Sequence, residues 1–226
     1  MSVVVHCGMP DEFRVLTKAL KPGTLILSGA AKLNLPTLVP PTCTRLLGMG
    51  VAGGLSPHMV VPDVAMAAMI FRKTGPAYPA DGAWNARAMA AARKTGITLH
   101  PVDYYSDGLQ NEANDPQQRA ALFKQYGVEA IDDELRFTVA EAQRRGIPVN
   151  CVRPLSDDYR AKLPPLATGQ SLNPDGSPNL AHLATALGED DQGSESVLKV
   201  MADYSASLDA LEAVAKALAS LIASEA

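Results

Sequence analysis

The chain has 226 residues, a formal net charge of −4 and 19% charged residues. This charge argues against a nucleic-acid partner held by bulk electrostatics and suits a small neutral or weakly charged ligand. No break in composition divides the chain, so its length predicts a single domain over residues 1–226.

The N-terminus and the cysteines predict a cytoplasmic protein. His6 and Asp11 interrupt the apolar core that a signal peptide needs, and no apolar stretch reaches the roughly 18 residues of a membrane-spanning helix. Cys7, Cys43 and Cys151 cannot all pair and form no CxxC motif, so we expect buried free thiols in a reducing compartment. An integral membrane segment is not expected.

Apolar runs alternate with helical patterns along most of the chain, which is typical of an α/β fold. Strands are expected at Ser2–Cys7, Thr24–Leu27, Thr44–Met49, Val64–Phe71, Ile97–Val102, Val128–Ile131 and Ile147–Val152. Helices are expected at Asp11–Leu20, Trp84–Arg93, Pro116–Tyr126, Asp133–Arg145, Ala181–Leu187 and Ser194–Ile222. Asp115 before Pro116 is a typical helix start, and Gly146 is a typical helix end. Turn-forming residues predict loops at Gln170–Pro178 and Gly188–Glu195.

The segment Gly8–Arg14, which follows the first expected strand, carries the first candidate functional residues. Gly8 allows the chain to turn sharply out of the sheet, and the following helix offers free backbone N–H groups to an oxygen-rich ligand. Glu12 and Arg14 can project over the strand ends. The alternative is that the acidic residues of the first turn only complement the helix dipole.

The segment Gly48–Leu55 is rich in glycine and also follows a strand. Gly48, Gly50 and Gly53 have the spacing G-x-G-x-x-G and would let the backbone approach a ligand closely. A dinucleotide site needs a helix at this point, whereas a serine-proline pair and another strand follow. A Rossmann oxidoreductase is therefore disfavoured, and the segment is either a ligand-binding loop or a packing turn.

Two acidic segments, Ala130–Glu134 and Arg153–Asp158, each end an apolar run, and twenty-one residues lie between Glu134 and Ser156. Because open α/β sheets bind ligands at the carboxyl ends of their strands, we expect a site where these two strands lie side by side. Taken singly, the acids fit a solvated helix N-terminus and Ser156 fits a helix N-cap. A metal site is disfavoured, because neighbouring strand residues face opposite sides and the four histidines are scattered.

In combination, these segments resemble the nucleoside phosphorylase/nucleosidase family, and most closely its methylthioadenosine/S-adenosylhomocysteine nucleosidase branch. That branch has G-x-M-x-x-E after its first strand, approached here by Cys7–Glu12, and G-x-A-G-G-L, matched by Gly50–Leu55. Its V-[ED]-M-E motif corresponds to Ile131–Glu134, and its S-D motif to Ser156 and Asp157. The resemblance extends from the N-terminus to about residue 158.

The segment after residue 158 is similar to another subgroup of the same family. Leu163–Pro165, followed by Asn173–Pro178 and an Ala/Leu-rich helix, resembles the hopanoid-associated phosphorylases. This similarity implies an adenosyl lipid as a candidate substrate.

The family resemblance implies a single-domain fold with a mixed central β-sheet flanked by helices, assembled as a homodimer or higher homo-oligomer. It also implies cleavage of the N-glycosidic bond of an adenine-type nucleoside by water or phosphate, without a cofactor or a metal. Such a reaction passes through an oxocarbenium-like sugar and needs a proton for the base, a hold on the ribose and a nucleophile. The implied catalytic residues are Asp157 as the acid, Ser156 as its orienting partner and Glu12 as the partner of an attacking water. The implied substrate-binding residues are Glu134 on the ribose hydroxyls, with Val51, Ala52, Gly53, Asp133 and Arg14 around the nucleoside or phosphate.

Some positions depart from the family pattern. Asp133 stands where the family has a methionine under the ribose. An aromatic residue for stacking on the base is not evident, although Tyr104 or Tyr105 can substitute. Arg14, and less favourably Arg45, remains as a phosphate partner, so the residues slightly favour water as the nucleophile. The alternative function is a catalytically weak nucleoside-binding protein on the same fold.

Overall fold

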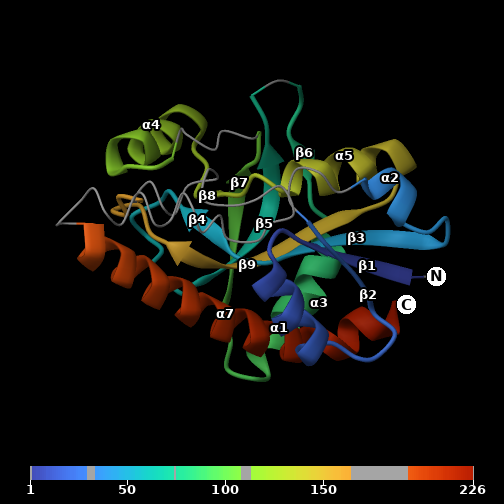
Figure 1. The fold of residues 1–226 in the computed structure, drawn as a ribbon. Helices are drawn as coiled ribbons and strands as arrows, with labels where there is room; N and C mark the ends of the chain where they lie inside the picture. Colours follow the sequence, from blue (N-terminus) through green and yellow to red (C-terminus); the bar gives the residue numbers. More distant parts are fainter. Residues whose placement is uncertain (1, 30–33, 74, 108–112, 164–192, 226) are drawn as a thin grey trace.

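The computed structural model describes residues 2–29, 34–73, 75–107, 113–163 and 193–225. One β-sheet runs through the molecule with helices on both of its faces, so the predicted α/β class is confirmed (Figure 1). The strands are β1 (Ser2–Cys7), β2 (Leu25–Ser28), β3 (Cys43–Met49), β4 (Ala52–Gly54), β5 (Val64–Phe71), β6 (Tyr78–Pro79), β7 (Leu99–Tyr105), β8 (Ala130–Ile131) and β9 (Val149–Asp157). The helices are α1 (Pro10–Ala19), α2 (Leu35–Leu38), α3 (Gly82–Arg93), α4 (Pro116–Tyr126), α5 (Leu135–Arg145) and α7 (Gly193–Ser224).

The sheet is mixed, as the family resemblance implied. Its strand order is β2-β1-β3-β9-β4-β8-β7-β5-β6, and β9 also pairs with β5. The pairs of β4 with β8, β5 with β6 and β5 with β9 are antiparallel, and the other pairs are parallel. The extra pairing between β9 and β5 closes five strands into a ring, with β9 at the junction between the ring and the open half of the sheet.

The expectation that the two acidic segments end neighbouring strands is wrong, because β4 lies between β8 and β9. The segment after β3 pairs as a short strand on both sides: Gly53 is in register with Ile131 of β8 and with Asp157 of β9. Glycines weaken the pattern by which a strand is recognised in a sequence, so the sequence predicted a loop or a turn here and not strand β4. The acidic segments therefore meet through an intervening strand.

Strand β9 is also longer than its apolar run indicates. It continues to Asp157, so Ser156 lies in a strand and not at a helix N-cap. The loop expected at Gln170–Pro178 and the helix expected at Ala181–Leu187 lie outside the described residues. The loop expected at Gly188–Glu195 is wrong for its last three residues, which begin α7.

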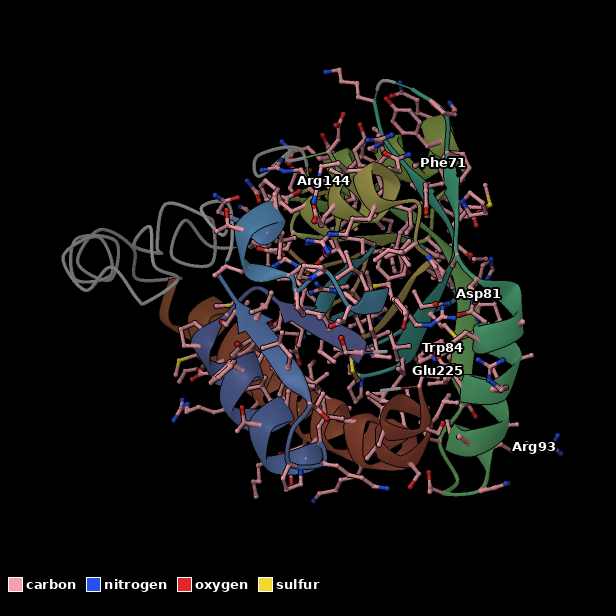
Figure 2. All side chains as sticks on the ribbon, turned by 90° about the vertical axis from the view of Figure 1, so that its right-hand side faces the viewer. Phe71, Asp81, Trp84, Arg93, Arg144 and Glu225 are labelled. Carbon is pink, nitrogen blue, oxygen red and sulfur yellow. The ribbon has the colours of Figure 1, made fainter. Side chains whose placement is uncertain are left out.

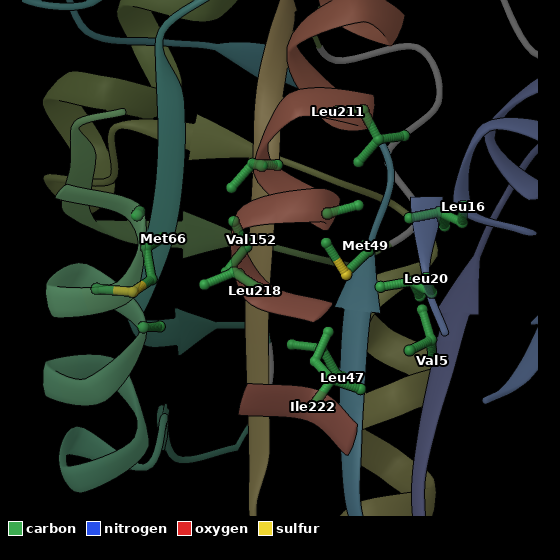
Figure 3. Close-up of a cluster of buried hydrophobic side chains, with 14 of the residues drawn as sticks. Val5, Leu16, Leu20, Leu47, Met49, Met66, Val152, Leu211, Leu218 and Ile222 are labelled. Atoms are coloured by element: carbon green, nitrogen blue, oxygen red, sulfur yellow. The ribbon is translucent and has the colours of Figure 1, made fainter. Parts of the chain in front are cut away.

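The helices cover the sheet in two layers and create two main hydrophobic clusters (Figure 1). Leucines of α1 and α7 meet methionines and valines of the central strands on one face (Figure 3). On the other face, α5 packs through Leu135, Val139 and Ala142. Cys7, Cys43 and Cys151 are buried and free, as predicted. Strands β1, β3 and β9 contribute buried residues to both clusters.

A buried polar network lies at the amino ends of β3 and β9. Arg45 Nε donates to Glu225 Oε2 at 2.8 Å, and its Nη2 pairs with Asp81 Oδ2 at 2.7 Å. The Arg45 guanidinium also bonds Asn150 and lies 5.8 Å from the Trp84 ring centroid. Figure 2 shows Asp81, Trp84 and Glu225 grouped between the start of α3 and the end of α7. Arg45 is thus engaged at the edge remote from the acidic segments, so it is not a phosphate partner there.

Candidate active site

Three glycines lie at the strand ends where the acidic side chains gather. A Cβ at Gly8 would be 2.9 Å from Glu134 Cδ, and one at Gly53 would be 3.1 Å from Asp157 Oδ1. A Cβ at Gly50 would be 2.6 Å from Arg153 Nη1 and 2.7 Å from Glu12 Oε1. These glycines are not among the glycines with positive φ. They are needed because they leave room for carboxylate and guanidinium groups directly on the backbone.

Glu12 is held by the backbone on three sides. Its Oε2 accepts hydrogen bonds from the N–H groups of Gly8 at 2.8 Å and Met9 at 2.9 Å. Its Oε1 accepts from the N–H of Val51 at 2.8 Å, so the carboxylate joins the start of α1 to the start of β4. The side chain is only 2% exposed. The bond from the Met9 N–H makes Glu12 part of a capping box at the start of α1, and the bond from Val51 extends its contacts beyond this helix.

Arg153 is the residue of this site that the sequence interpretation missed. It is fully buried on β9, pairs with Asp132 Oδ2 at 2.7 Å and donates from Nη1 to the Val51 carbonyl at 3.0 Å. Its Nε and Nη2 have no hydrogen-bond partner within the part of the chain that the structure describes. An arginine within an apolar strand is the signal that could have identified it, because charges are rarely buried unless they are paired.

The glutamate cluster, defined as Glu12, Asp132, Glu134 and Arg153, places one guanidinium among three carboxyl groups. Burial raises the pKa of Glu12, and the charge of Arg153 opposes this shift. Burial also raises the pKa of Asp132 well above its usual range, again opposed by Arg153. Burial lowers the pKa of Arg153, but the surrounding carboxylates outweigh it and keep the guanidinium charged. A cluster of this composition can accept a proton.

A second group, the aspartate cluster, consists of Ser156, Asp157 and Arg119. Ser156 Oγ is 2.7 Å from Asp157 Oδ2 and 3.2 Å from the carbonyl oxygen of Ala52. The hydroxyl can therefore donate to an ionised Asp157, or rotate toward Ala52 and accept a proton-bearing Oδ2. Ser156 thus links Asp157 of β9 to the backbone of β4.

Arg119 completes the aspartate cluster from α4, and sequence reasoning did not assign it a role. Its side chain is 1% exposed, and it forms an ion pair with Asp157 Oδ1. Asp115 Oδ1 accepts from the N–H groups of Gln117 and Gln118 at 2.8 and 2.9 Å, which confirms the predicted start of α4. Nothing in the sequence around Arg119 distinguishes it from a surface arginine of an amphipathic helix.

Strand β4 and the residue before it join the two clusters. Val51 donates to Glu12 and accepts from Arg153, Ala52 accepts from Ser156, and Gly54 accepts from Arg119 at 2.9 Å. The segment therefore contacts both clusters through its backbone, and its role in ligand binding stays a prediction. Both clusters lie along this segment.

Three residues expected near the ligand join neither cluster. The Arg14 side chain is 77% exposed on α1 and forms an ion pair with Asp11. Tyr104 is fully buried in the hydrophobic cluster that includes α5, and its hydroxyl donates to the Ala65 carbonyl at 3.5 Å. Tyr105 is fully buried against the ring of Tyr126, 4.8 Å between centroids. Neither tyrosine presents a ring surface for stacking, because the core covers both.

The acidic segment between β8 and α5 separates into different roles. Asp132 is buried and accepts from the N–H of Leu135 at 2.5 Å, so it caps α5 from within the core. Asp133 and Glu134 are partly buried in the turn, and Glu134 lies over Gly8. In the described residues, no group of three His, Cys, Asp or Glu side chains is arranged to hold a metal ion. None of the described helices has the length and apolar character to cross a membrane.

The fold and these clusters define an α/β protein with paired carboxylate sites at the ends of a mixed sheet. The family model described as "Phosphorylase superfamily" matches residues 3–187. The chain belongs to this family of enzymes, which confirms the resemblance drawn from the four segments. No curated protein matches the chain by sequence.

Solved structures of low sequence identity share the fold. The methylthioadenosine/S-adenosylhomocysteine nucleosidase of Neisseria meningitidis is 16% identical with a TM-score of 0.65, covering 97% of this chain and 100% of that one. The Helicobacter pylori enzyme of the same name, a mutant with 5′-methylthioadenosine in its active site, is 14% identical with a TM-score of 0.61, covering 84% and 99%. The H. pylori futalosine hydrolase is 13% identical with a TM-score of 0.59, covering 89% and 98%.

Proposed function

We propose that this protein cleaves the N-glycosidic bond of a purine nucleoside of the adenine type. The observation that carries the proposal is the alignment of the glutamate cluster and the aspartate cluster along one short strand, β4. Glycosidic cleavage requires two separate proton-handling groups, one for the departing base and one for the nucleophile. The family membership and the nucleosidases of the same fold support this assignment.

Asp157 and Ser156 act on the base in this proposal. Asp157 Oδ2 carries a proton to a ring nitrogen of the purine, and the electron pair of the breaking C–N bond goes to the base. Ser156 then turns its hydroxyl to donate to the newly ionised carboxylate, which is within 2.7 Å. Glu134 accepts hydrogen bonds from the ribose hydroxyls and stabilises the cationic sugar by its charge.

Water is the proposed nucleophile, and Glu12 accepts its proton. Glu12 is fixed by three backbone N–H groups, and burial raises its pKa, which makes it a stronger base than an exposed glutamate. A phosphate dianion would instead enter beside three carboxyl groups that share one guanidinium. The positions of Arg14 on the surface and of Arg45 at the opposite edge support water over phosphate.

The decisive experiment is product analysis. The protein is incubated with adenosine and 5′-methylthioadenosine, with and without phosphate, and free base and sugar are separated by chromatography. We expect adenine and free sugar in both conditions. Strict dependence on phosphate with a sugar phosphate as product would contradict the proposed nucleophile, and absence of free base from a wider set of purine nucleosides would contradict the function.

A nucleoside-binding protein with weak catalysis is the second candidate. The burial of Tyr104 and Tyr105 in the core favours it, because a tight catalytic hold on the base usually includes an aromatic face. Adenosine would then raise the melting temperature without releasing adenine. We further propose a cytoplasmic homodimer or higher homo-oligomer, whose subunit count light scattering would measure.

A further inference from the structure

Arg119 makes three polar contacts around Asp157. Its guanidinium forms an ion pair with Asp157 Oδ1, and its Nη1 donates to the carbonyls of Gly54 at 2.9 Å and Asp158 at 3.2 Å. These partners belong to β4, to β9 and to the residue that follows β9. The arginine thus fixes the carboxyl group of Asp157 relative to β9, which carries it, and to the neighbouring strand β4.

Burial makes this ion pair costly in desolvation free energy, which suggests a role other than stability. Arg119 is 1% exposed and the Asp157 side chain is 13% exposed, so both groups have lost most of their hydration. A buried ion pair of this kind contributes little to stability compared with apolar residues of similar volume. By contrast, the electrostatic effect of a fixed guanidinium on a neighbouring carboxyl group is strongest where water is excluded.

We propose that Arg119 is a positioning residue for the proton transfer to the leaving base, acting through Asp157. It holds Oδ1, while Oδ2 carries the proton that moves to the purine ring nitrogen as the glycosidic bond breaks. The negative charge that remains on Asp157 then faces the guanidinium of Arg119, and solvent returns a proton before the next turnover. This inference rests on the proposed function and adds a residue that no motif of the chain indicates.

The test compares leaving groups that need a proton with one that does not. Purine nucleosides require protonation of the base, whereas p-nitrophenyl β-D-riboside releases p-nitrophenolate without it. For Arg119→Met we expect kcat on the purine nucleoside to fall roughly ten- to a hundredfold. This loss does not exceed the ~10²–10⁴-fold rate enhancement that general acid catalysis supplies. On the p-nitrophenyl riboside we expect a change of less than about threefold.

Arg160→Met is the matched control, because Arg160 forms an ion pair with the neighbouring Asp158 but is 64% exposed. It should behave as wild type on both substrates. A second readout uses only the purine nucleoside: added guanidinium ion should restore part of the turnover of Arg119→Ala, with no effect on the Arg160 variant.

Equal losses on the two substrates, or unchanged purine turnover in Arg119→Met, would overturn the role of Arg119. Failure of guanidinium ion to raise the turnover of Arg119→Ala would count against it as well. These outcomes differ from failure of the proposed function, in which wild-type protein releases no base from any nucleoside.

Discussion

Glu134 is the residue expected to recognise the sugar. It lies over Gly8 at the start of α5, where a charged carboxylate can accept hydrogen bonds from ribose hydroxyls. We expect Glu134→Gln to lower kcat/KM on a ribonucleoside by an amount equivalent to roughly 1.5–3 kcal/mol, as for other hydrogen bonds to charged groups. The matching 2′-deoxynucleoside should lose less. Equal losses on both would remove Glu134 from contact with the 2′-hydroxyl.

His6 predicts a pH dependence of stability rather than of activity. Its ring contacts Thr138 Oγ1 at 2.8 Å and the Gly29 carbonyl at 3.3 Å, and burial lowers its pKa to about 4. Between pH 6.5 and 4 the unfolded chain binds a proton at this residue and the folded chain does not, so folding stability falls as the pH falls. The shift corresponds to about 3 kcal/mol at most.

Urea unfolding of the wild type and of His6→Gln at pH 7 and pH 4.5 measures this contribution. Glu12 and Asp132 have raised pKa values and act in the opposite direction, because their contribution to stability is lost as the pH rises. The wild type should therefore lose more stability than the variant on acidification, by about 1–3 kcal/mol. Parallel losses in the two proteins would show that His6 is protonated in the folded state.

At the level of elements, the turn from β3 into β4 contains Gly50, which has no room for a side chain. An alanine at position 50 would meet Arg153 and Glu12, and both are fixed by buried hydrogen bonds. We expect Gly50→Ala to cost about 1–3 kcal/mol of unfolding free energy and at least tenfold in kcat. Gly82→Ala is the control, since nothing lies within 4 Å of its added Cβ. A Gly50 variant as stable and active as the control would contradict this description of the turn before β4.

Features set by local sequence patterns could be predicted, whereas contacts between distant elements could not. The long apolar runs and the helix caps at Asp115 and Gly146 follow from local patterns, so most elements lie where the periodicity indicated. The family motifs also predicted Glu12, Glu134 and Asp157, which lie at the start of α1, the start of α5 and the end of β9. Arg119 was not predicted, because its ion pair with Asp157 joins α4 to β9 and no local pattern records that contact. Arg153 was missed although its place in an apolar strand is a local signal, and its partner Asp132 follows another strand.

At the level of the molecule, α7 is fastened to the sheet at its end by the network around Arg45. Glu225 accepts from Arg45 and also pairs with Arg87, and its side chain is 21% exposed. We expect Glu225→Gln to lower the unfolding free energy by about 1–2 kcal/mol, because the change leaves a largely buried arginine short of a partner. Asp203→Asn removes the exposed pair with Lys199 and should cost no more than about 0.5 kcal/mol. Equal effects of the two changes would mean that the network is only a surface feature.

The proposed catalysis depends on the fold bringing an acid and a base to opposite ends of one short strand. Asp157→Asn tests it most directly, because the amide keeps the shape of the side chain but cannot supply the proton. Release of free adenine from a natural nucleoside should fall by roughly a hundredfold or more, while nucleoside binding, followed by the melting temperature, should persist. Near-normal release of adenine by the Asn variant would contradict the assignment of this site.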